Sequence, residues 1–388
     1  MIDLEDTSSA FAYKSNWELR KALYLFSFLK YPSIVKLGSK LLRLLLSLKI
    51  PIKPIIRQTI FNQFCGGENI YACNKRITQL AKYNVGTILD YSVEGQENID
   101  DFEHNKKEII NTILMAKNND NIPFSVFKVT GLGRCSLIEK ASKKKKELNE
   151  KEKKEIDELI FRIDQICKIA FENNVSVFID AEDSFYQDFI DYVAELMIKR
   201  YNNKSAIVYN TIQLYRHDKI DYLKRLINYC KQENLYLGVK LVRGAYMEKE
   251  RELAFLKGYK DPIHATKKDT DFDYNQALKF CVDNIDYVSI CAGSHNENST
   301  KTLIKLMSEK NLLNNDNRVY FAQLLGMSDH ISFNLSKNGY NVAKYVPYGP
   351  INKLLPYLIR RAEENTSVSG QTGRELTLLK IELDRRSI

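Results

Sequence analysis

Short runs of β-branched and aromatic residues alternate with amphipathic stretches from about residue 85 onward. The runs have the length of strands, and the stretches between them carry apolar residues at three- and four-residue spacing, which is typical of helices. The runs expected to form strands are Gly86–Tyr91, Phe124–Thr130, Val175–Asp180, Ala206–Gln213, Tyr236–Val242, Tyr287–Ala292, Arg318–Gln323 and Val342–Val346. Eight βα units close into a barrel more readily than they extend as an open sheet. The pattern therefore predicts an α/β fold, a TIM-like (β/α)8 barrel.

Helical spacing also dominates the chain before the first predicted strand. Residues 17–30 and 33–50 read as two helices with prolines at their breaks, and a third is expected at about 71–83. We therefore expect an N-terminal helical extension over residues 1–84 and a catalytic barrel over residues 85–388. The second helix is apolar and basic; packing against the barrel is the favoured interpretation, and an amphipathic membrane anchor is the alternative.

The net charge of +9 raises the question of a polyanionic partner. Much of this charge lies on single lysines in helices that also carry glutamates. The Lys-rich insertion at 141–155 mixes both signs at helical spacing, which favours a solvated helix face. Nucleic-acid binding stays the alternative, but no interleaved aromatic residues or recognition motif accompany the lysines. We expect no nucleic-acid partner.

Neither a membrane span nor a targeting segment is indicated. No stretch reaches the roughly 18 apolar residues that a span needs, and early acidic residues do not fit a signal peptide or a mitochondrial presequence. We expect a cytoplasmic protein. The seven cysteines form no CxxC pair, and with five histidines and no HExxH motif no metal is expected.

Polar residues gather where the predicted strands end, which in such barrels is the active-site face. In strand order they are Asp90, Lys128, Asp180, Gln213, Lys240, Arg243, Ser294, His295, Asn296, Gln323 and Tyr345, followed by Arg360 and Arg361 in the last predicted helix. Burying so many charges costs free energy unless each has a partner of opposite charge in the protein or a ligand. Their clustering therefore indicates a ligand-binding site. The excess of cations over neutralising acids favours a ligand with carboxylate and phosphate groups.

Adjacent arginines on a helix diverge by about 100°, so Arg360 and Arg361 are expected to face two partners, such as a substrate carboxylate and a cofactor. The alternative is structural pairing with Glu363, Glu364 and Glu382. Lys240 and Arg243 flank the turn KLVRGAY, whose glycine lets the backbone approach a phosphate or a flavin edge. There is no GxGxxG and no P-loop, which argues against those nucleotide sites.

Several motifs resemble the signatures of the proline dehydrogenase family. They are KLVRGAYMEKER (240–251), QLLGMSDH (323–330), KYVPYGP (344–350) and YLIRRAEEN (357–365), with FIDAED (178–183), FKVTGLGR (127–134), FCGGE (64–68) and SHN (294–296) in support. They occur in the family's order over residues 64–365. The resemblance implies a distorted barrel that holds FAD non-covalently and oxidises L-proline to 1-pyrroline-5-carboxylate by hydride transfer from proline C5 to flavin N5.

The same resemblance assigns site residues. Lys128, Asp180, Tyr345, Arg360 and Arg361 match catalytic positions in the proline pocket, where the arginines hold the carboxylate; Leu324 and Tyr357 match its walls, and Glu68 matches the acid that pairs with Arg360 and closes it. Gln213, Lys240, Arg243, Gly244, Ala245, Tyr246, Ser294, His295, Asn296 and Glu364 match the flavin shell.

The family also implies partners. Electrons pass to a membrane quinone, which predicts peripheral contact with the inner face of the cell membrane, for which residues 41–50 are the candidate. A separate pyrroline-5-carboxylate dehydrogenase carries out the next step of proline breakdown to glutamate.

Rival functions stay open, and the chain departs from the family at some positions. A hydroxyproline dehydrogenase differs by small pocket changes, but Tyr345 fills the space that a ring hydroxyl needs. A Schiff-base lyase using Lys128 or Lys240, and a basic nucleic-acid-binding protein, are alternatives of other classes.

Lys240 and Arg243 exchange the residue types common in relatives, Ser294 replaces a threonine, and the insertion at 141–155 matches no known motif.

Overall fold

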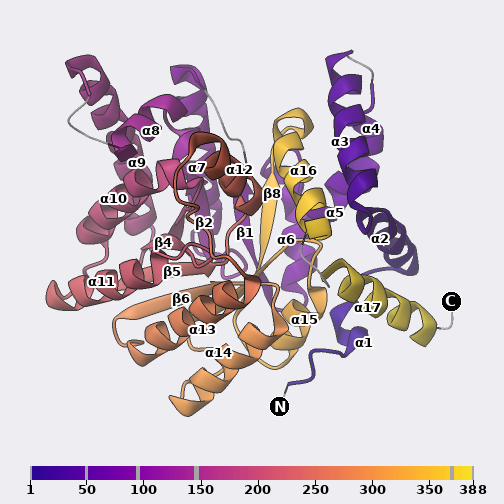
Figure 1. Ribbon diagram of the computed structural model, residues 1–388. Coiled ribbons are helices and arrows are strands. Elements are labelled where there is room, and N and C mark those ends of the chain that lie inside the picture. The colour runs from indigo at the N-terminus through magenta and orange to yellow at the C-terminus, as the bar shows by residue number, and fades with distance from the viewer. Residues whose placement is uncertain (1, 49–50, 93–96, 144–147, 368–370, 387–388) are drawn as a thin grey trace. The chain divides into compact units, whose positions relative to one another are not determined.

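Eight parallel strands form a closed barrel in the order of the sequence (Figure 1). This computed structural model describes residues 2–48, 51–92, 97–143, 148–367 and 371–386. The strands are β1 Val85–Tyr91, β2 Phe124–Lys128, β3 Ser176–Asp180, β4 Val208–Gln213, β5 Leu237–Val242, β6 Val288–Gly293, β7 Val319–Leu324 and β8 Val342–Tyr348. Each predicted strand is present with ends shifted by at most two residues, so the predicted barrel is confirmed.

Helices precede the barrel and fill the connections between its strands. Before β1 lie α1 Thr7–Ala10, α2 Asn16–Leu29, α3 Pro32–Ser47, α4 Lys53–Ile56, η1 Arg57–Phe61, α5 Asn62–Phe64, η2 Tyr71–Cys73 and α6 Asn74–Ala81. The others are α7 Ile99–Ala116, η3 Val129–Gly131, α8 Cys135–Lys143, α9 Glu150–Glu172, α10 Ser184–Tyr201, α11 Lys219–Gln232, α12 Met247–Lys257, α13 Lys267–Asp283, α14 Glu297–Glu309, α15 Asp329–Lys337, α16 Ile351–Ser367 and α17 Gln371–Arg385. None of these described helices is long and apolar enough to cross a membrane.

Local signals set several helix ends. Ser15 and Glu18 form a reciprocal capping box at α2, and Asn149 and Glu152 form another at α9. The Lys-rich insertion thus contains the end of α8 and the start of α9, while residues 144–147 lie outside the described part of the chain. Arg360 and Arg361 are not in the last helix, because α17 follows α16.

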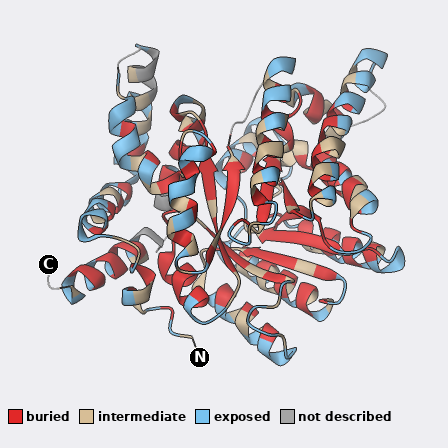
Figure 2. Cartoon of the chain, turned by 180° about the vertical axis from the view of Figure 1, so that it is seen from behind, coloured by how far each residue is buried: buried red, intermediate tan, exposed pale blue. Residues whose placement is uncertain are grey.

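The chain divides into two compact units, residues 1–87 with 323–388, and residues 88–322. In the first unit, side chains of the N-terminal helices share an apolar core with α16 and α17; its buried members include Phe11, Leu19, Phe26, Leu354, Leu358 and Leu379. These units do not follow the boundary at 84/85, which stays a prediction. Figure 2 shows the strands almost wholly buried and the helices exposed along one side.

Within the second unit, aromatic side chains fill the barrel interior near the N-terminal ends of the strands. Phe124 and Phe178 stack with ring centroids 4.4 Å apart, and the edges of Tyr209 and Tyr320 meet the ring of Phe124 at 5.5 and 4.8 Å. These rings come from β2, β3, β4 and β7. The layer makes a packed floor, so polar chemistry is confined to the C-terminal ends of the strands.

Candidate active site

A layer of buried charges lies nearer the C-terminal ends of the strands in the second unit. Lys128 and Asp180 are register partners on β2 and β3, and Asp180 forms an ion pair with Lys240 of β5. Lys240 is 5 % exposed, and its ammonium lies 5.1 Å from the centroid of the Phe178 ring. Thr211 of β4, between the two partners, donates to Asp180 at 3.4 Å. The structure therefore brings three predicted site residues together directly above the aromatic floor.

The neighbouring strand adds an acid that the prediction left without a role. Asp90 on β1 is 2 % exposed, lies 3.3 Å from the Lys128 ammonium and accepts a hydrogen bond from Ser92. The expected shortage of neutralising acids is thus wrong here, because each of the two lysines has a protein carboxylate beside it. A buried ion pair of this kind holds its two side chains in place.

Gln213, at the end of β4, is held by one end of its amide. Its Nε2 donates to the Glu182 carbonyl at 3.1 Å, and its side chain is almost fully buried. The Oε1 atom is also buried and has no hydrogen-bond partner among the described residues. Glu182 is tied in turn to η3, which follows β2, because its carboxylate accepts the backbone N–H of Thr130 at 3.0 Å. A buried amide oxygen of this kind is an acceptor available to a ligand.

Arg243, just after β5, organises the loop that follows β6. Its guanidinium donates to Asp271 at 2.8 Å, to Ser294 at 2.7 Å and to Ser299 at 2.8 Å. Burial opposes ionisation of Asp271, but hydrogen bonds from Lys267 and Arg243 hold the pKa of this carboxyl below its usual value. The described contacts of Arg243 therefore point to positioning of the SHN segment.

The SHN segment itself is built around one hydroxyl. Ser294 Oγ accepts the backbone N–H of Asn296 at 3.1 Å while it receives the Arg243 guanidinium. Asn296 caps α14 by accepting the Ser299 N–H at 3.0 Å. Ser294 is buried, whereas His295 and Asn296 are half-buried. Hydrogen bonds through Ser294 Oγ thus link three predicted flavin-shell residues, Arg243, Ser294 and Asn296.

The turn after Arg243 requires glycine. Gly244 has φ +140°, and a Cβ there would lie 2.4 Å from atoms of the Tyr215 ring. The next two predicted shell residues differ in exposure, since Ala245 is exposed and Tyr246 is half-buried. Exposed backbone at Gly244 and Ala245 is what close approach of a ligand needs.

In the first unit, the FCGGE segment pairs with the end of β8. Gly66 donates to the Pro347 carbonyl at 2.9 Å, and Gly349 donates to the Gly67 carbonyl at 3.1 Å. A Cβ on Gly66 would lie 2.5 Å from a methyl of Val346, which explains the glycine. Glu68 follows this pairing and forms an ion pair with Arg57. The Glu68–Arg360 pair stays a prediction.

The two adjacent arginines lie on α16, which starts three residues after β8 ends. Arg361 is 6 % exposed and its guanidinium lies 5.4 Å from the centroid of the buried Tyr357 ring, while Arg360 is half-buried. Glu382, one proposed structural partner, instead accepts hydrogen bonds from Arg385 and Arg386. The side chain of Glu364, predicted to contact the flavin, lies outside the described residues.

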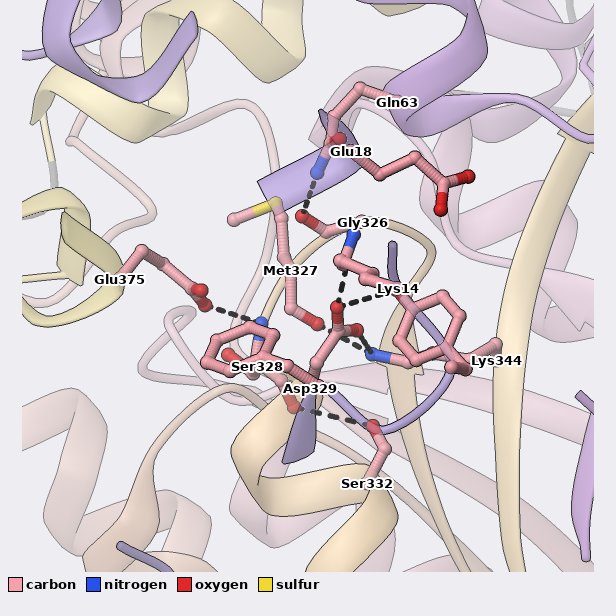
Figure 3. Close-up of polar contacts among 12 residues, drawn as sticks. Lys14, Glu18, Gln63, Gly326, Met327, Ser328, Asp329, Ser332, Lys344 and Glu375 are labelled. Carbon is pink, nitrogen blue, oxygen red and sulfur yellow. Dashed lines mark hydrogen bonds and ion pairs between the residues drawn. The ribbon is translucent and has the colours of Figure 1, made fainter. Parts of the chain in front are cut away.

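Buried polar groups hold the turn between β7 and α15 in place (Figure 3). The Leu325 N–H donates to the Tyr345 carbonyl at 2.9 Å, which fixes the start of the turn between β7 and α15. Lys344, fully buried on β8, donates to the Met327 carbonyl at 2.6 Å and lies 2.8 Å from the Asp329 carboxylate.

The N-terminal segment holds the other side of the same turn. Gln63 donates to the Gly326 carbonyl at 2.8 Å, and the Tyr13 hydroxyl donates to Asp329 at 2.6 Å. Lys14 lies 3.5 Å from the same carboxylate. Segments far apart in sequence therefore fix the geometry of the turn that bears Leu324.

Burial and charge act against each other within this cluster. Burial opposes ionisation of Asp329, but the charges of Lys344 and Lys14 with hydrogen bonds from Lys344 and Tyr13 lower the pKa of this carboxyl to about 2. Burial lowers the pKa of Lys344, partly offset by Asp329. Burial also raises the pKa of Glu375, whose carboxylate accepts the Ser328 N–H. Asp329 is therefore the carboxylate that balances the buried lysine.

Asp90, Glu182, Asp271, Asp329 and Lys344 are the polar residues near the site to which sequence reasoning gave no role. Asp90 was among the polar residues at the strand ends, but its pairing with Lys128 was not predicted. Lys344 precedes Tyr345 on β8, so the two side chains point to opposite faces of the strand. A lysine inside a predicted buried strand and inside the KYVPYGP motif could have indicated a buried ion pair. Asp271 lies in a helix pattern with many other charges and gave no such signal.

Comparison with known proteins agrees with the motifs. A family model described as proline dehydrogenase matches residues 73–374. The chain belongs to the proline dehydrogenase family. The chain is thus an oxidoreductase that acts on a CH–NH group of its donor.

The relatives that cover nearly all of the chain include two dehydrogenases with different names. Proline dehydrogenase 1, mitochondrial, of Dictyostelium discoideum is 33 % identical over 99 % of this chain and 75 % of its own length. Hydroxyproline dehydrogenase of Xenopus laevis is 31 % identical over 97 % of this chain and 88 % of its own. Both names are those of dehydrogenases, but of different donors.

The fold has counterparts among solved structures. Proline utilization A from Bdellovibrio bacteriovorus matches with a TM-score of 0.72 at 21 % identity over 82 % of this chain. The match spans about a third of that longer protein, 35 % of its length. At this identity the likeness establishes the barrel fold.

Proposed function

We propose that this chain is a proline dehydrogenase that oxidises L-proline to 1-pyrroline-5-carboxylate with non-covalently bound FAD. The observation that carries the proposal is the buried Lys128–Asp180–Lys240 layer above an aromatic floor, in a chain of this family. A buried site of this kind disfavours a protonated amine, because loss of hydration opposes its charge. A neutral amine is what the reaction needs, since an ammonium resists loss of hydride from the adjacent carbon.

The proposed substrate residues bind different parts of proline. Arg360 and Arg361 bind the carboxylate, since the guanidinium fork matches its two oxygens. Tyr345 bounds the proline ring. The catalytic set proposed is Lys128, Asp180, Tyr345, Arg360 and Arg361, with Leu324 and Tyr357 as walls and Glu68 as the closing acid. In the structure Glu68 forms an ion pair with Arg57.

The proposed FAD site rests on residues of the strand ends. They are Gln213, Lys240, Arg243, Gly244, Ala245, Tyr246, Ser294, His295, Asn296 and Glu364. The buried Oε1 of Gln213 fits a bound flavin, because a buried acceptor without a partner costs about 1–3 kcal/mol that a ligand N–H would recover. When bound, the flavin supplies the acceptor for the hydride of proline C5. Lys240 then places positive charge in the layer where negative charge would develop.

We further propose that the electrons pass to a membrane quinone and that a separate pyrroline-5-carboxylate dehydrogenase consumes the product. This makes the reaction the first step of proline conversion to glutamate, carried out at the inner face of the cell membrane. The support for a quinone as electron acceptor is that the chain resembles the proline dehydrogenase family, in which this acceptor is expected.

Hydroxyproline dehydrogenase is the second candidate, favoured by the Xenopus laevis relative that covers 97 % of this chain. A steady-state assay with L-proline and trans-4-hydroxy-L-proline, using a soluble quinone analogue as acceptor, separates the two. We expect kcat/KM for proline to exceed that for hydroxyproline at least about tenfold, about 1.4 kcal/mol of discrimination. Preference for hydroxyproline would replace the main proposal with the second, and turnover of neither would overturn both.

A further inference from the structure

Buried polar side chains lie on the outer side of the barrel in the second unit, between β4 and the helices α10 and α11 that pack against it (Figure 1). We call them the outer polar network; its residues are Gln187 and Asp191 of α10, Asn210 of β4 and Lys219 of α11, each at most 6 % exposed. Successive side chains of a strand point to opposite faces, so Asn210 points away from the face of β4 that bears Gln213. The network therefore lies behind the strand that carries Gln213.

Asp191 is the centre of this network. Its carboxylate accepts hydrogen bonds from Gln187 at 2.9 Å, from Asn210 at 3.0 Å and from Lys219 at 2.5 Å. Burying a charged pair costs free energy unless further hydrogen bonds satisfy the remaining lone pairs. The two amides supply these bonds, which ties their geometry to the carboxylate.

The carboxylate also decides which end of each amide faces it. An ionised carboxylate only accepts hydrogen bonds, so both amides have to turn their NH2 groups toward Asp191. Asn210 does so although its Oδ1 is then buried without a hydrogen-bond partner in the described part of the chain. In Gln187 the same orientation leaves Oε1 to accept the backbone N–H of Glu182 at 3.0 Å.

Glu182 transmits this orientation to Gln213. Its N–H is held by Gln187, and its carboxylate accepts both the backbone N–H and the hydroxyl of Thr130. The carbonyl of Glu182 is thereby fixed, and it accepts Gln213 Nε2 at 3.1 Å. A carbonyl only accepts, so Gln213 has to turn its Oε1 the other way. That Oε1 is the buried acceptor to which a ligand N–H was assigned above.

We propose that Gln187 and Asp191 are positioning residues, which act through Glu182 to present Gln213 Oε1 as the acceptor for a flavin N–H. The identity of the ligand as a flavin rests on the proposed function. The orientation of the Gln213 amide does not, because the hydrogen bonds that set it are all within the protein. The two proposals can therefore fail separately.

The first test needs no flavin. It is NMR of the full chain labelled with isotopic glutamine before FAD is added, with the Gln213 amide signals assigned by their loss in Gln213→Leu. Gln187→Leu removes the two hydrogen bonds that connect Asp191 to Glu182. We expect the Gln213 signals to shift or broaden, because the Glu182 carbonyl is no longer held.

Gln165→Leu is the matched control for that substitution. Gln165 also lies on a helix of the second unit, α9, and its half-buried amide accepts a hydrogen bond from Lys106 at 3.1 Å. It is not part of the outer polar network. The control should leave the Gln213 signals unchanged.

The second test is the dissociation constant of FAD, measured by the quenching of FAD fluorescence as protein is added. Gln187→Leu should weaken FAD binding at least about tenfold in the parent and less than about twofold in the Gln213→Leu background. A residue that acts through Gln213 has nothing left to position once that amide is removed. A purely structural role of Gln187 would weaken binding equally in both backgrounds.

A second variant keeps the test decisive if Gln187→Leu does not fold. Asp191→Asn with Lys219→Met removes both members of the buried charged pair, which is less disruptive than removing one. An amide at position 191 can donate as well as accept, so Gln187 loses its fixed orientation. We expect the same direction of change in the Gln213 signals and in FAD affinity.

Unchanged Gln213 signals in these variants, or equal weakening of FAD binding with and without Gln213, would overturn the positioning role. A parent that binds no FAD would overturn the proposed function and the flavin as ligand. The amide signals would still decide whether Gln187 positions Gln213.

Discussion

At the scale of single residues, the buried ion pair of Lys240 and Asp180 sets how much a substitution in the site should cost. Replacing Lys240 with methionine would leave Asp180 charged and nearly buried, without its described ammonium partner. We expect a loss of about 3–5 kcal/mol in the free energy of unfolding, measured by urea denaturation of the protein.

Lys153→Met is the control for that substitution. Lys153 pairs with Glu150 at 2.6 Å, but the two side chains are 53 % and 89 % exposed. Removal of an exposed pair should change stability by less than about 1 kcal/mol. Equal effects of the two substitutions would show that the Lys240–Asp180 pair is solvated, contrary to the site described above.

Asp329 should give the fold a specific dependence on acid. Because the pKa of this buried carboxyl falls from 3.8 to about 2, its ionised form stabilises the fold above about pH 4, and this contribution disappears as the pH falls to about 2. The shift corresponds to about 2 kcal/mol at neutral pH. Asp329→Asn should lower stability at pH 7 and flatten its decline between pH 4 and pH 2, followed by chemical denaturation.

The exposed Asp221→Asn on α11 is the reference for that experiment, since its carboxylate is 82 % exposed. It should leave the curve of stability against pH unchanged. If Asp329→Asn keeps the full acid dependence of the parent, the carboxylate is not the balancing charge for Lys344.

At the scale of elements, the turn between β7 and α15 depends on a glycine that cannot be replaced. Gly326 has φ +79°, and a Cβ there would lie 2.2 Å from the Gln63 carbonyl. Gly326→Ala should therefore destabilise the protein by at least about 3 kcal/mol and raise KM for proline, because the turn starts at Leu324. Thermal unfolding and steady-state kinetics measure the two effects.

Gly339 offers a close control, because its φ is +78° and a Cβ there would meet no described atom within 4 Å. Gly339→Ala should cost about 1–2 kcal/mol from backbone strain and leave KM unchanged. If both alanine variants behave alike, the contact with Gln63 does not hold the turn.

The elements themselves were largely predictable, and their contacts were not. Each strand is a short apolar run bounded by polar residues, so periodicity found all eight within two residues of their ends. The pairings Asp90–Lys128 and Arg243–Asp271 join residues far apart in sequence, and spacing carries no information about such contacts. Glu68 shows the same limit, since its ion pair with Arg57 was not predicted from the sequence.

At the scale of the whole molecule, the order of the motifs predicted the family correctly. The distribution of positive charge along the chain was predicted less well. The positive charge was assigned to scattered lysines, yet residues 16–57 have a net charge of +8. Summing charge by segment would have revealed this from the sequence. That the same helices leave nine large apolar side chains exposed required the structure, because amphipathic periodicity does not say which face is covered.

The central claim is that the protein is an FAD enzyme for proline, and the visible spectrum of the purified protein tests it most directly. We expect the absorption bands of oxidised flavin, bleached on anaerobic addition of L-proline and far less by trans-4-hydroxy-L-proline. A protein that stays colourless after FAD is supplied, or whose flavin bands do not respond to proline, would contradict the account.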